Sequence, residues 1–243
     1  MQRFEKQMRA YLCEDIYWDV DQVNSHPSIL ISLLTNLNIH IPILLQEYVE
    51  QREKVLNQIA ESYGTTNAIA KNLMLRLMYG GRVKSWIQEH ALGLPSDEYL
   101  DQKLEWLVED LEIINQKLQR FSLFQTAVQV FNNTYLAAER TRTSFLSLIC
   151  TEYERQVLMY VKNWLAQQTP QRHLDVLIHD GGLMRRLPGE EEPPQQLLTG
   201  LNEELKKHFN TPYIKYTYKK FSNVISNILR AEIDQEQPYS IQA

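Results

Sequence analysis

The feature that most constrains the fold is the wide separation of the strand-like segments. Alternation over residues 16–21 and an apolar run over 173–179 predict two short strands, and residues 213–221 predict a last one. Residues 183–187 continue beyond Gly181-Gly182, which predicts a hairpin with a glycine turn. A sheet built from such distant segments predicts an α+β fold, with helices packed on one face of a small antiparallel sheet.

Helical periodicity fills most of the remaining chain. Ser25 is a candidate N-cap for a helix that carries an apolar stripe. Thr65 or Thr66 is a candidate N-cap for a later helix, which runs through Tyr79. The other predicted helices cover residues 1–12, 43–61, 86–92, 98–121, 124–168 (one helix or a pair) and 195–209. The protein is therefore expected to be mostly helical.

Composition excludes several classes of protein. The net charge of −5 argues against a surface that coats nucleic acid indiscriminately, but a local basic cleft is compatible with it. The two cysteines, Cys13 and Cys150, have neither metal-site nor disulfide spacing, which favours a reducing compartment. No apolar run approaches the roughly 20 residues of a membrane span. The charged start lacks the apolar core of a signal peptide. We expect an intracellular protein, in host cytoplasm or nucleus, with no membrane partner.

Carboxylates at strand ends are the candidate chemical groups. Asp180 follows the apolar strand at 173–179, while Asp19 and Asp21 share one face of the strand at 16–21. Mg²⁺ is commonly held by one or two carboxylates together with substrate phosphates. Two separated strand ends that each carry an aspartate therefore indicate a two-metal phosphoryl-transfer site with Mg²⁺ as the cofactor.

Three ordered motifs carry a resemblance to a known family. The first is Trp18-Asp19-Val20-Asp21 with the polar-to-helix turn that follows, and the second runs from Lys71 through Leu75 to Tyr79-Gly80. The third is Ile178-His179-Asp180, followed by Gly181. Together they resemble the motifs of family A DNA polymerases, and more closely a divergent branch found in viruses, virophages and transposon-like elements. The family has Glu where this chain has Gly181, and an aromatic residue where it has Leu75.

The resemblance implies a role for each matched residue. Asp180 and either Asp21 or Asp19 would be the catalytic metal ligands; we favour Asp21, and the other register makes Asp19 the ligand. Lys71 would be catalytic and meet a triphosphate, with Leu75 and Tyr79 beside the base. The remaining implied positions are nucleotide-binding Asn24 and His26, and DNA-binding His179, Arg140 and Ser144.

The implied activity is template-directed DNA synthesis in the replication of a viral or mobile element, with a DNA primer–template, deoxynucleoside triphosphates and two Mg²⁺ ions. The implied domains are residues 1–37 and 122–243 as two parts of a palm, and 38–121 as helical fingers. No thumb or exonuclease is recognisable, so other domains or proteins would supply thumb, primase or helicase functions. Two alternatives stay open at this point: a decayed or fragmentary polymerase core that binds nucleic acid or assists assembly, and an all-helical scaffold.

Overall fold

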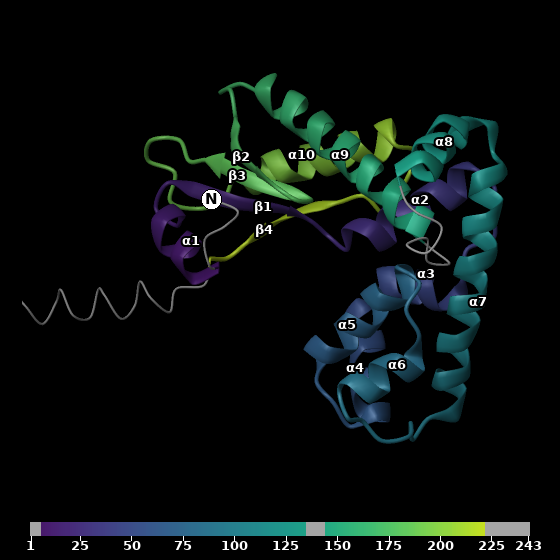
Figure 1. The fold of residues 1–243 in the computed structure, drawn as a ribbon. Helices are drawn as coiled ribbons and strands as arrows, with labels where there is room; N and C mark the ends of the chain where they lie inside the picture. The colour runs from purple at the N-terminus through teal and green to yellow at the C-terminus, as the bar shows by residue number, and fades with distance from the viewer. Residues whose placement is uncertain (1–5, 135–143, 222–243) are drawn as a thin grey trace, which may run out of the picture. The chain divides into compact units, whose positions relative to one another are not determined.

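The computed structural model describes residues 6–134 and 144–221, shown as a ribbon in Figure 1. Contacts divide the chain into two compact units, and both are discontinuous in sequence. The first unit draws on residues 1–23, 156–207 and 215–243, and the second on 24–155 and 208–214. The sheet belongs to the first unit, and most of the helices belong to the second.

The sheet has four strands, β1 (Tyr17–Gln22), β2 (Leu174–Ile178), β3 (Gly181–Arg185) and β4 (Tyr216–Lys219). Their spatial order is β2-β3-β1-β4, and every neighbouring pair is antiparallel. The first strand is therefore an inner strand between two partners that come from the far end of the sequence. The α+β prediction, with a small antiparallel sheet and mostly helix elsewhere, is confirmed.

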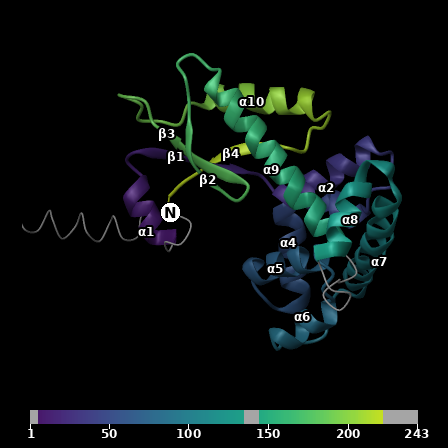
Figure 2. The ribbon, with the colours of Figure 1, turned by 45° about the horizontal axis from the view of Figure 1, so that its top comes forward.

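The two faces of β1 differ as its alternation predicts. Trp18 and Val20 are buried, whereas Tyr17, Asp19 and Asp21 are only half-buried. Met184 of β3 pairs with Trp18 and is buried on the same face. The other buried apolar residues of the first unit include Val157, Val161, Leu165, Leu198, Leu201 and Leu205. Several of these come from α10 (Gln195–His208) and from the later part of α9 (Ser144–Ala166), which lie beside each other in Figures 1 and 2.

Helix α10 is tied to both of its neighbours by side-chain hydrogen bonds. Tyr160 of α9 donates to Glu204 at 3.1 Å. Asn202 donates to the Tyr216 carbonyl at 3.1 Å and accepts from the Tyr216 amide at 2.8 Å. These two bonds satisfy both backbone groups of the first residue of β4, so they fix where that edge strand starts.

The hairpin of β2 and β3 is confirmed, but its turn lies elsewhere than predicted. The turn consists of His179 and Asp180, while Gly181 and Gly182 are the first residues of β3. A Cβ on Gly182 would lie 2.7 Å from the carbonyl oxygen of Val176. The glycines therefore permit close strand packing, and the chain reversal falls on the two polar residues before them.

The second unit is helical. Its elements are α2 (Ser25–Asn36), α3 (Ile43–Glu50), α4 (Arg52–Tyr63), α5 (Asn67–Met78), α6 (Val83–Glu89), α7 (Glu98–Arg120), the short 3₁₀ helix η1 (Ser122–Phe124), α8 (Gln125–Thr134) and the first part of α9. The remaining helix, α1 (Lys6–Cys13), belongs to the first unit. Thr66 caps α5 by accepting from the Ile69 amide at 3.4 Å, as predicted.

Two details of this unit differ from expectation. The single helix predicted over 43–61 is two helices, because Gln51 has φ −136° and ψ 47° and cannot continue the helical turn. The cap of α2 is Asn24 in the left-handed region at φ 49°, and Ser25 is already helical. Asparagine tolerates that conformation better than serine, which explains the one-residue shift.

The predicted domain boundaries at 37 and 121 do not coincide with the two units. α2 and η1 fall inside the helical unit together with the first half of α9. Nothing in the contacts assigns the functional labels of palm and fingers, which stay predictions.

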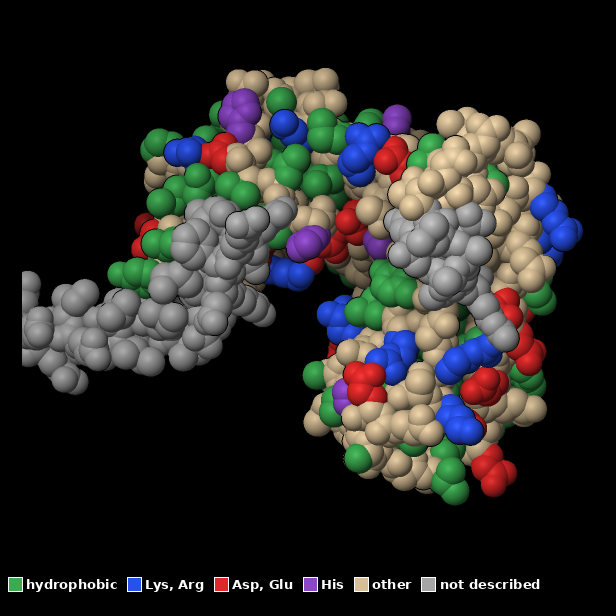
Figure 3. Space-filling model, viewed as in Figure 1, with side chains coloured by type: hydrophobic (Ala, Val, Ile, Leu, Met, Phe, Trp, Pro, Cys, Tyr) green, Lys and Arg blue, Asp and Glu red, His purple; other side chains and the backbone are tan. Residues whose placement is uncertain are grey.

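No helix among the described residues is long and apolar enough to cross a membrane. On the face of the molecule in Figure 3, Lys and Arg side chains are interspersed with Asp and Glu. This mixed surface is the kind that the small net charge predicts.

Replacing Gly200 by Ala should stabilise the first unit by about 1 kcal/mol, because glycine within a helix gives up more conformational freedom than alanine. Gly200 lies in α10, and a Cβ there would meet only the Trp164 ring at 3.7 Å, an ordinary contact. Urea unfolding of the two proteins measures the difference. A lower free energy of unfolding for the variant would contradict this packing of α10 on α9.

Candidate functional site

Asp21 and Asp180 are brought together by the register of the sheet. The Cα of Asp21 pairs with that of Gly181, and Asp180 is the residue immediately before Gly181. Paired antiparallel strands and consecutive residues set upper limits on Cα distances, which place the two aspartate Cα atoms within roughly 9 Å of each other. The two strand ends that the sequence singled out therefore meet at one end of β1.

Gly181 makes this approach possible. A Cβ on Gly181 would lie 2.2 Å from the Val20 carbonyl oxygen and 2.9 Å from both the Cα and Oδ1 of Asp21. The Asp21 carboxylate thus leans over Gly181, toward the hairpin that carries Asp180. Gly181, which stands where the family has Glu, is therefore required here, because any side chain at this position would overlap β1.

A cation already lies at this carboxylate. Lys219 of β4 forms an ion pair through Nζ with Asp21 Oδ2. Lys219 is on the same sheet face as Asp19 and Asp21, because Asp19 pairs with Lys219 in the register. The ion pair shows that the Asp21 carboxylate accommodates a positive charge, and carboxylate oxygens are also the ligands of Mg²⁺.

Backbone strain marks the hairpin turn of the first unit. His179, in that turn, has φ 49°. Residues other than glycine adopt this region at a cost, and such residues cluster where function requires them. His179 is exposed, so its side chain is accessible to a ligand.

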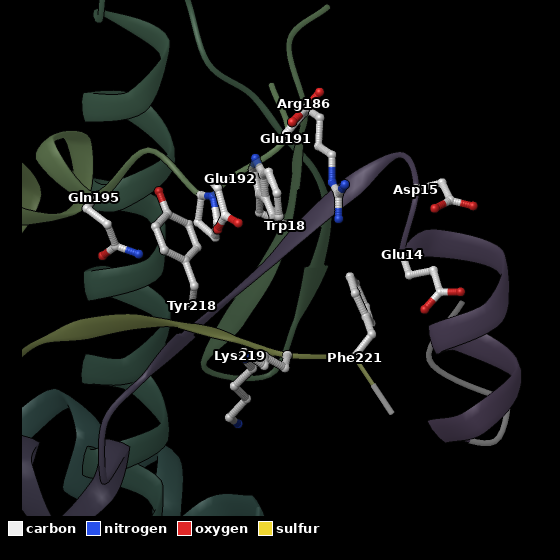
Figure 4. A pocket seen from close by; sticks show the side chains of 12 residues that line it. Glu14, Asp15, Trp18, Arg186, Glu191, Glu192, Gln195, Tyr218, Lys219 and Phe221 are labelled. Carbon is white, nitrogen blue, oxygen red and sulfur yellow. The ribbon is translucent and has the colours of Figure 1, made fainter. Parts of the chain in front are cut away.

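A pocket of about 490 Å³ is lined by aromatic and charged side chains of the first unit, among them Trp18 and Tyr218 of the opposite sheet face and also Lys219. Figure 4 shows Trp18 and Tyr218 on this side, with Arg186 beside Trp18. The Arg186 guanidinium carbon lies 3.7 Å from the centroid of the Trp18 ring, a cation–π contact. None of the predicted site residues lines this pocket.

The loop at the edge of the pocket is held by Glu190. Its carboxylate accepts two hydrogen bonds from Arg172, at 2.8 and 2.6 Å, one from Trp18 Nε1 at 2.9 Å and one from the Leu187 amide at 3.2 Å. Burial alone would raise the pKa of Glu190. The bonds from Arg172, Trp18 and Leu187 outweigh burial and lower that pKa to about 2.

The second unit contains its own cluster of polar side chains. His26 Nε2 lies 2.9 Å from Glu154 Oε2, and His26 Nδ1 lies 2.6 Å from the Tyr79 hydroxyl. A carboxylate can only accept, so Nε2 donates to Glu154, and in the neutral imidazole Nδ1 then accepts from Tyr79. Ser25 also donates to Glu154, at 3.0 Å. The Tyr79 ring is thereby fixed in an edge-on contact with His26.

Helix α5 presents the stripe that its spacing predicts. Lys71 is exposed, Leu75 half-buried and Tyr79 37% exposed, whereas the other face of the helix is buried. Of the residues predicted to bind a nucleotide, the structure joins His26 and Tyr79 by a hydrogen bond, and Lys71 and Leu75 lie on the helix that Tyr79 ends. Asn24 stands at the N-cap position of α2, where its side chain makes no capping hydrogen bond.

The remaining predicted residues are less informative. Asp19 shares its sheet face with Asp21 but lies two residues further from the hairpin turn, across from Leu183. The register therefore favours Asp21 as the partner of Asp180. Ser144 begins α9, and nothing is described of its side chain. Arg140 lies outside the described residues.

The sequence does not predict the contacts of two residues in these clusters. Lys219 is part of a run of cations and aromatics, but only the pairing of β4 with β1 reveals its contact with Asp21. Glu154 carries no motif and is one acid within a long helix, so no local pattern indicates its contact with His26. Among the described residues, no group of three or more His, Cys, Asp or Glu side chains is arranged to hold a metal ion.

Comparisons with known proteins add one relative. No family model matches the sequence. The chain is 26% identical over 196 residues to a Sputnik virophage protein named "Putative helicase V13", and the match covers 78% of this chain and 23% of that protein. The chain thus spans less than a quarter of the length of this relative.

This relative contradicts the predicted DNA polymerase function, because its name describes a helicase. The prediction depended on three short motifs, each of which has an ordinary structural explanation in an α+β fold. A turn aspartate, a surface lysine on an amphipathic helix and an acidic strand end are all common in proteins without that activity. The order and spacing of the motifs are real features of the chain, but they do not determine its reaction.

Proposed function

We propose that this chain is a nucleic-acid-processing module of a replication protein, and that it binds a divalent cation between Asp21 and Asp180. The observation that carries the proposal is the pairing of Asp21 with Gly181, which brings the two aspartates to one end of β1. The likeness to a helicase-named viral protein supports a nucleic-acid substrate.

The module is proposed as a partner of an ATP-hydrolysing motor and not as the motor itself. P-loop motors bind nucleotide phosphates through a glycine-rich loop that ends in Gly-Lys followed by Ser or Thr. None of the eight glycines in the sequence is followed by lysine. The sequence therefore lacks that loop.

Bound Mg²⁺ would supply charge neutralisation for a phosphate group of the nucleic acid. Asp21 and Asp180 would orient the cation, since their oxygens are the ligands that Mg²⁺ prefers. His179, exposed in the adjacent turn, would donate a hydrogen bond to the phosphate. The proposal requires no third carboxylate, because phosphate oxygens and water complete the coordination of Mg²⁺ in such sites.

In the second unit we propose that the α5 stripe contacts nucleic acid. Lys71 offers a charge to a phosphate, and the Tyr79 ring offers a face on which a base can stack. His26, which is itself paired with Glu154, hydrogen-bonds the Tyr79 hydroxyl, and this reduces the freedom that the ring would lose on binding.

The metal site is tested by titrating the protein with Mn²⁺, a paramagnetic substitute for Mg²⁺, and measuring free Mn²⁺ by electron paramagnetic resonance. Asp21→Asn and Asp180→Asn should each weaken binding by about tenfold or more, because each removes a charged ligand. Glu203→Gln, which alters an exposed carboxylate on α10, is the matched control and should bind as the wild type does. Equal affinity of all four proteins would refute the site.

A further inference from the structure

Lys219 has an unusual position in the first unit. It is the last residue of β4, and its Nζ pairs with Oδ2 of Asp21, although the residue directly across from it is Asp19. The lysine thus reaches diagonally along the sheet to the carboxylate nearest the hairpin turn. Figure 4 shows the Lys219 side chain directed away from Trp18 and Tyr218, toward the other side of the sheet.

The two oxygens of Asp21 face different neighbours. Oδ2 pairs with the lysine, and Oδ1 is the oxygen that lies 2.9 Å from the Cβ position of Gly181, the residue that follows Asp180. The Asp21 side chain is only 14% exposed, whereas that of Lys219 is 56% exposed. The carboxylate is therefore held in place, while the long lysine stem has space to swing.

We propose that Lys219 is the resident counter-ion of the Asp21 site: it pairs with Asp21 when no divalent cation is bound, is displaced when one binds, and then contacts the phosphate of the bound nucleic acid. This inference rests on the proposed function, because it assumes that Asp21 is a metal ligand. A divalent cation replaces the ammonium group because it carries twice the charge and coordinates carboxylate oxygens directly.

The surroundings of Lys219 support a return to this position. Asp19 lies directly across the strand pair from Lys219, so a displaced ammonium group has a second carboxylate on the same face. Along the chain, Lys219 follows Tyr218, whose side chain lies on the opposite face, and precedes Lys220, the first residue after β4. Lys219 also borders the pocket that Glu14, Asp15, Glu191 and Glu192 line. The released lysine would thus remain next to the metal, where a phosphate oxygen would bind, and a single cation would serve in both states.

The experiment compares Mn²⁺ affinity, by the same resonance titration, in wild type, Lys219→Met, Lys219→Arg and Lys220→Met. Lys219→Met removes the competing cation and should tighten Mn²⁺ binding by about fivefold to tenfold. Lys219→Arg keeps the charge and should bind close to the wild-type affinity. Lys220→Met is the matched control, because it removes the same charge one residue further on, and it should leave Mn²⁺ affinity within about twofold.

A second measurement separates this role from that of an ordinary cross-strand pair. With Mn²⁺ saturating, fluorescence anisotropy of a labelled single-stranded oligonucleotide should show weaker binding by Lys219→Met, about threefold to tenfold, because a phosphate contact is lost. Metal affinity and oligonucleotide affinity would then change in opposite directions, and no effect on folding alone produces that result. Thermal unfolding checks that each variant is folded.

Two results would overturn the inference. The first refutes only the role of Lys219, and the second also refutes the proposed metal site. If Asp21→Asn loses Mn²⁺ while Lys219→Met binds it as Lys220→Met does, the role of Lys219 is refuted and the metal site stands. If Asp21→Asn binds Mn²⁺ as tightly as the wild type, the proposed function fails and the role of Lys219 fails with it.

Discussion

Gly181→Ala is expected to lower the free energy of unfolding of the sheet-containing unit by about 3 kcal/mol or more. The new Cβ would lie 2.2 Å from the Val20 carbonyl oxygen and 2.9 Å from the Asp21 Cα. Both atoms belong to the backbone, so no rotation of a side chain relieves the overlap. Strand β3 must move away from β1, and with it the residue that precedes Gly181 moves away from Asp21.

Urea unfolding measures the loss of stability. Mn²⁺ titration of the folded fraction measures the loss of metal affinity that is expected when Asp180 moves away from Asp21. Gly93→Ala is the matched control. A Cβ on Gly93 would meet nothing within 4 Å, and its φ lies outside the left-handed region, so this variant should be as stable as the wild type. Unchanged stability of Gly181→Ala would show that β1 and β3 do not pair in this register.

The second large effect is expected from Glu190→Gln, which should cost about 3 kcal/mol of stability at pH 7. The pKa of Glu190 falls from its usual 4.5 to about 2 on folding. Each unit by which the pKa of the folded state lies below that of the unfolded state stabilises the folded protein by roughly 1.4 kcal/mol at pH 7. Glutamine keeps the size of the side chain but leaves the Arg172 guanidinium without its charged partner. The loop beside the pocket would lose its main anchor.

The pH dependence has a definite sign. A carboxylate whose pKa is lowered by folding contributes its full stability above about pH 4.5, and the contribution disappears as the pH falls toward 2. The difference in unfolding free energy between wild type and Glu190→Gln should therefore shrink steadily over that interval. Glu191→Gln, at the exposed neighbouring acid, should show no such difference. A gap that stays constant down to pH 2 would contradict the role of the ionised carboxylate.

Much of the fold follows from local patterns in the sequence. The alternation over 16–21 correctly separates buried Trp18 and Val20 from Asp19 and Asp21, since residues two apart share a face of any strand. The amphipathic pattern that starts at Glu98 predicts α7 to within one residue of its end. The break at Gln51 was missed because the apolar spacing continues across it, and only the backbone angles reveal two helices.

The candidate site was only partly predictable, for a related reason. Local patterns identify which residues end strands, so Asp21 and Asp180 could be selected before any fold was known. The register between β1, β3 and β4 depends on contacts between distant segments, which no single motif encodes. Such long-range contacts place Lys219 beside Asp21 and Glu154 beside His26. The reaction was predicted least well, because short motifs identify residue types without showing which substrate they meet.

The most direct test of the central claim is the anomalous scattering of Mn²⁺ in crystals of the protein grown with that ion. We predict a peak within coordination distance, roughly 2.0–2.3 Å, of carboxylate oxygens from both Asp21 and Asp180, with the Lys219 ammonium group moved off Asp21. A structure with saturating Mn²⁺ in which Asp21 still pairs with Lys219, and in which no peak joins the two aspartates, would contradict it.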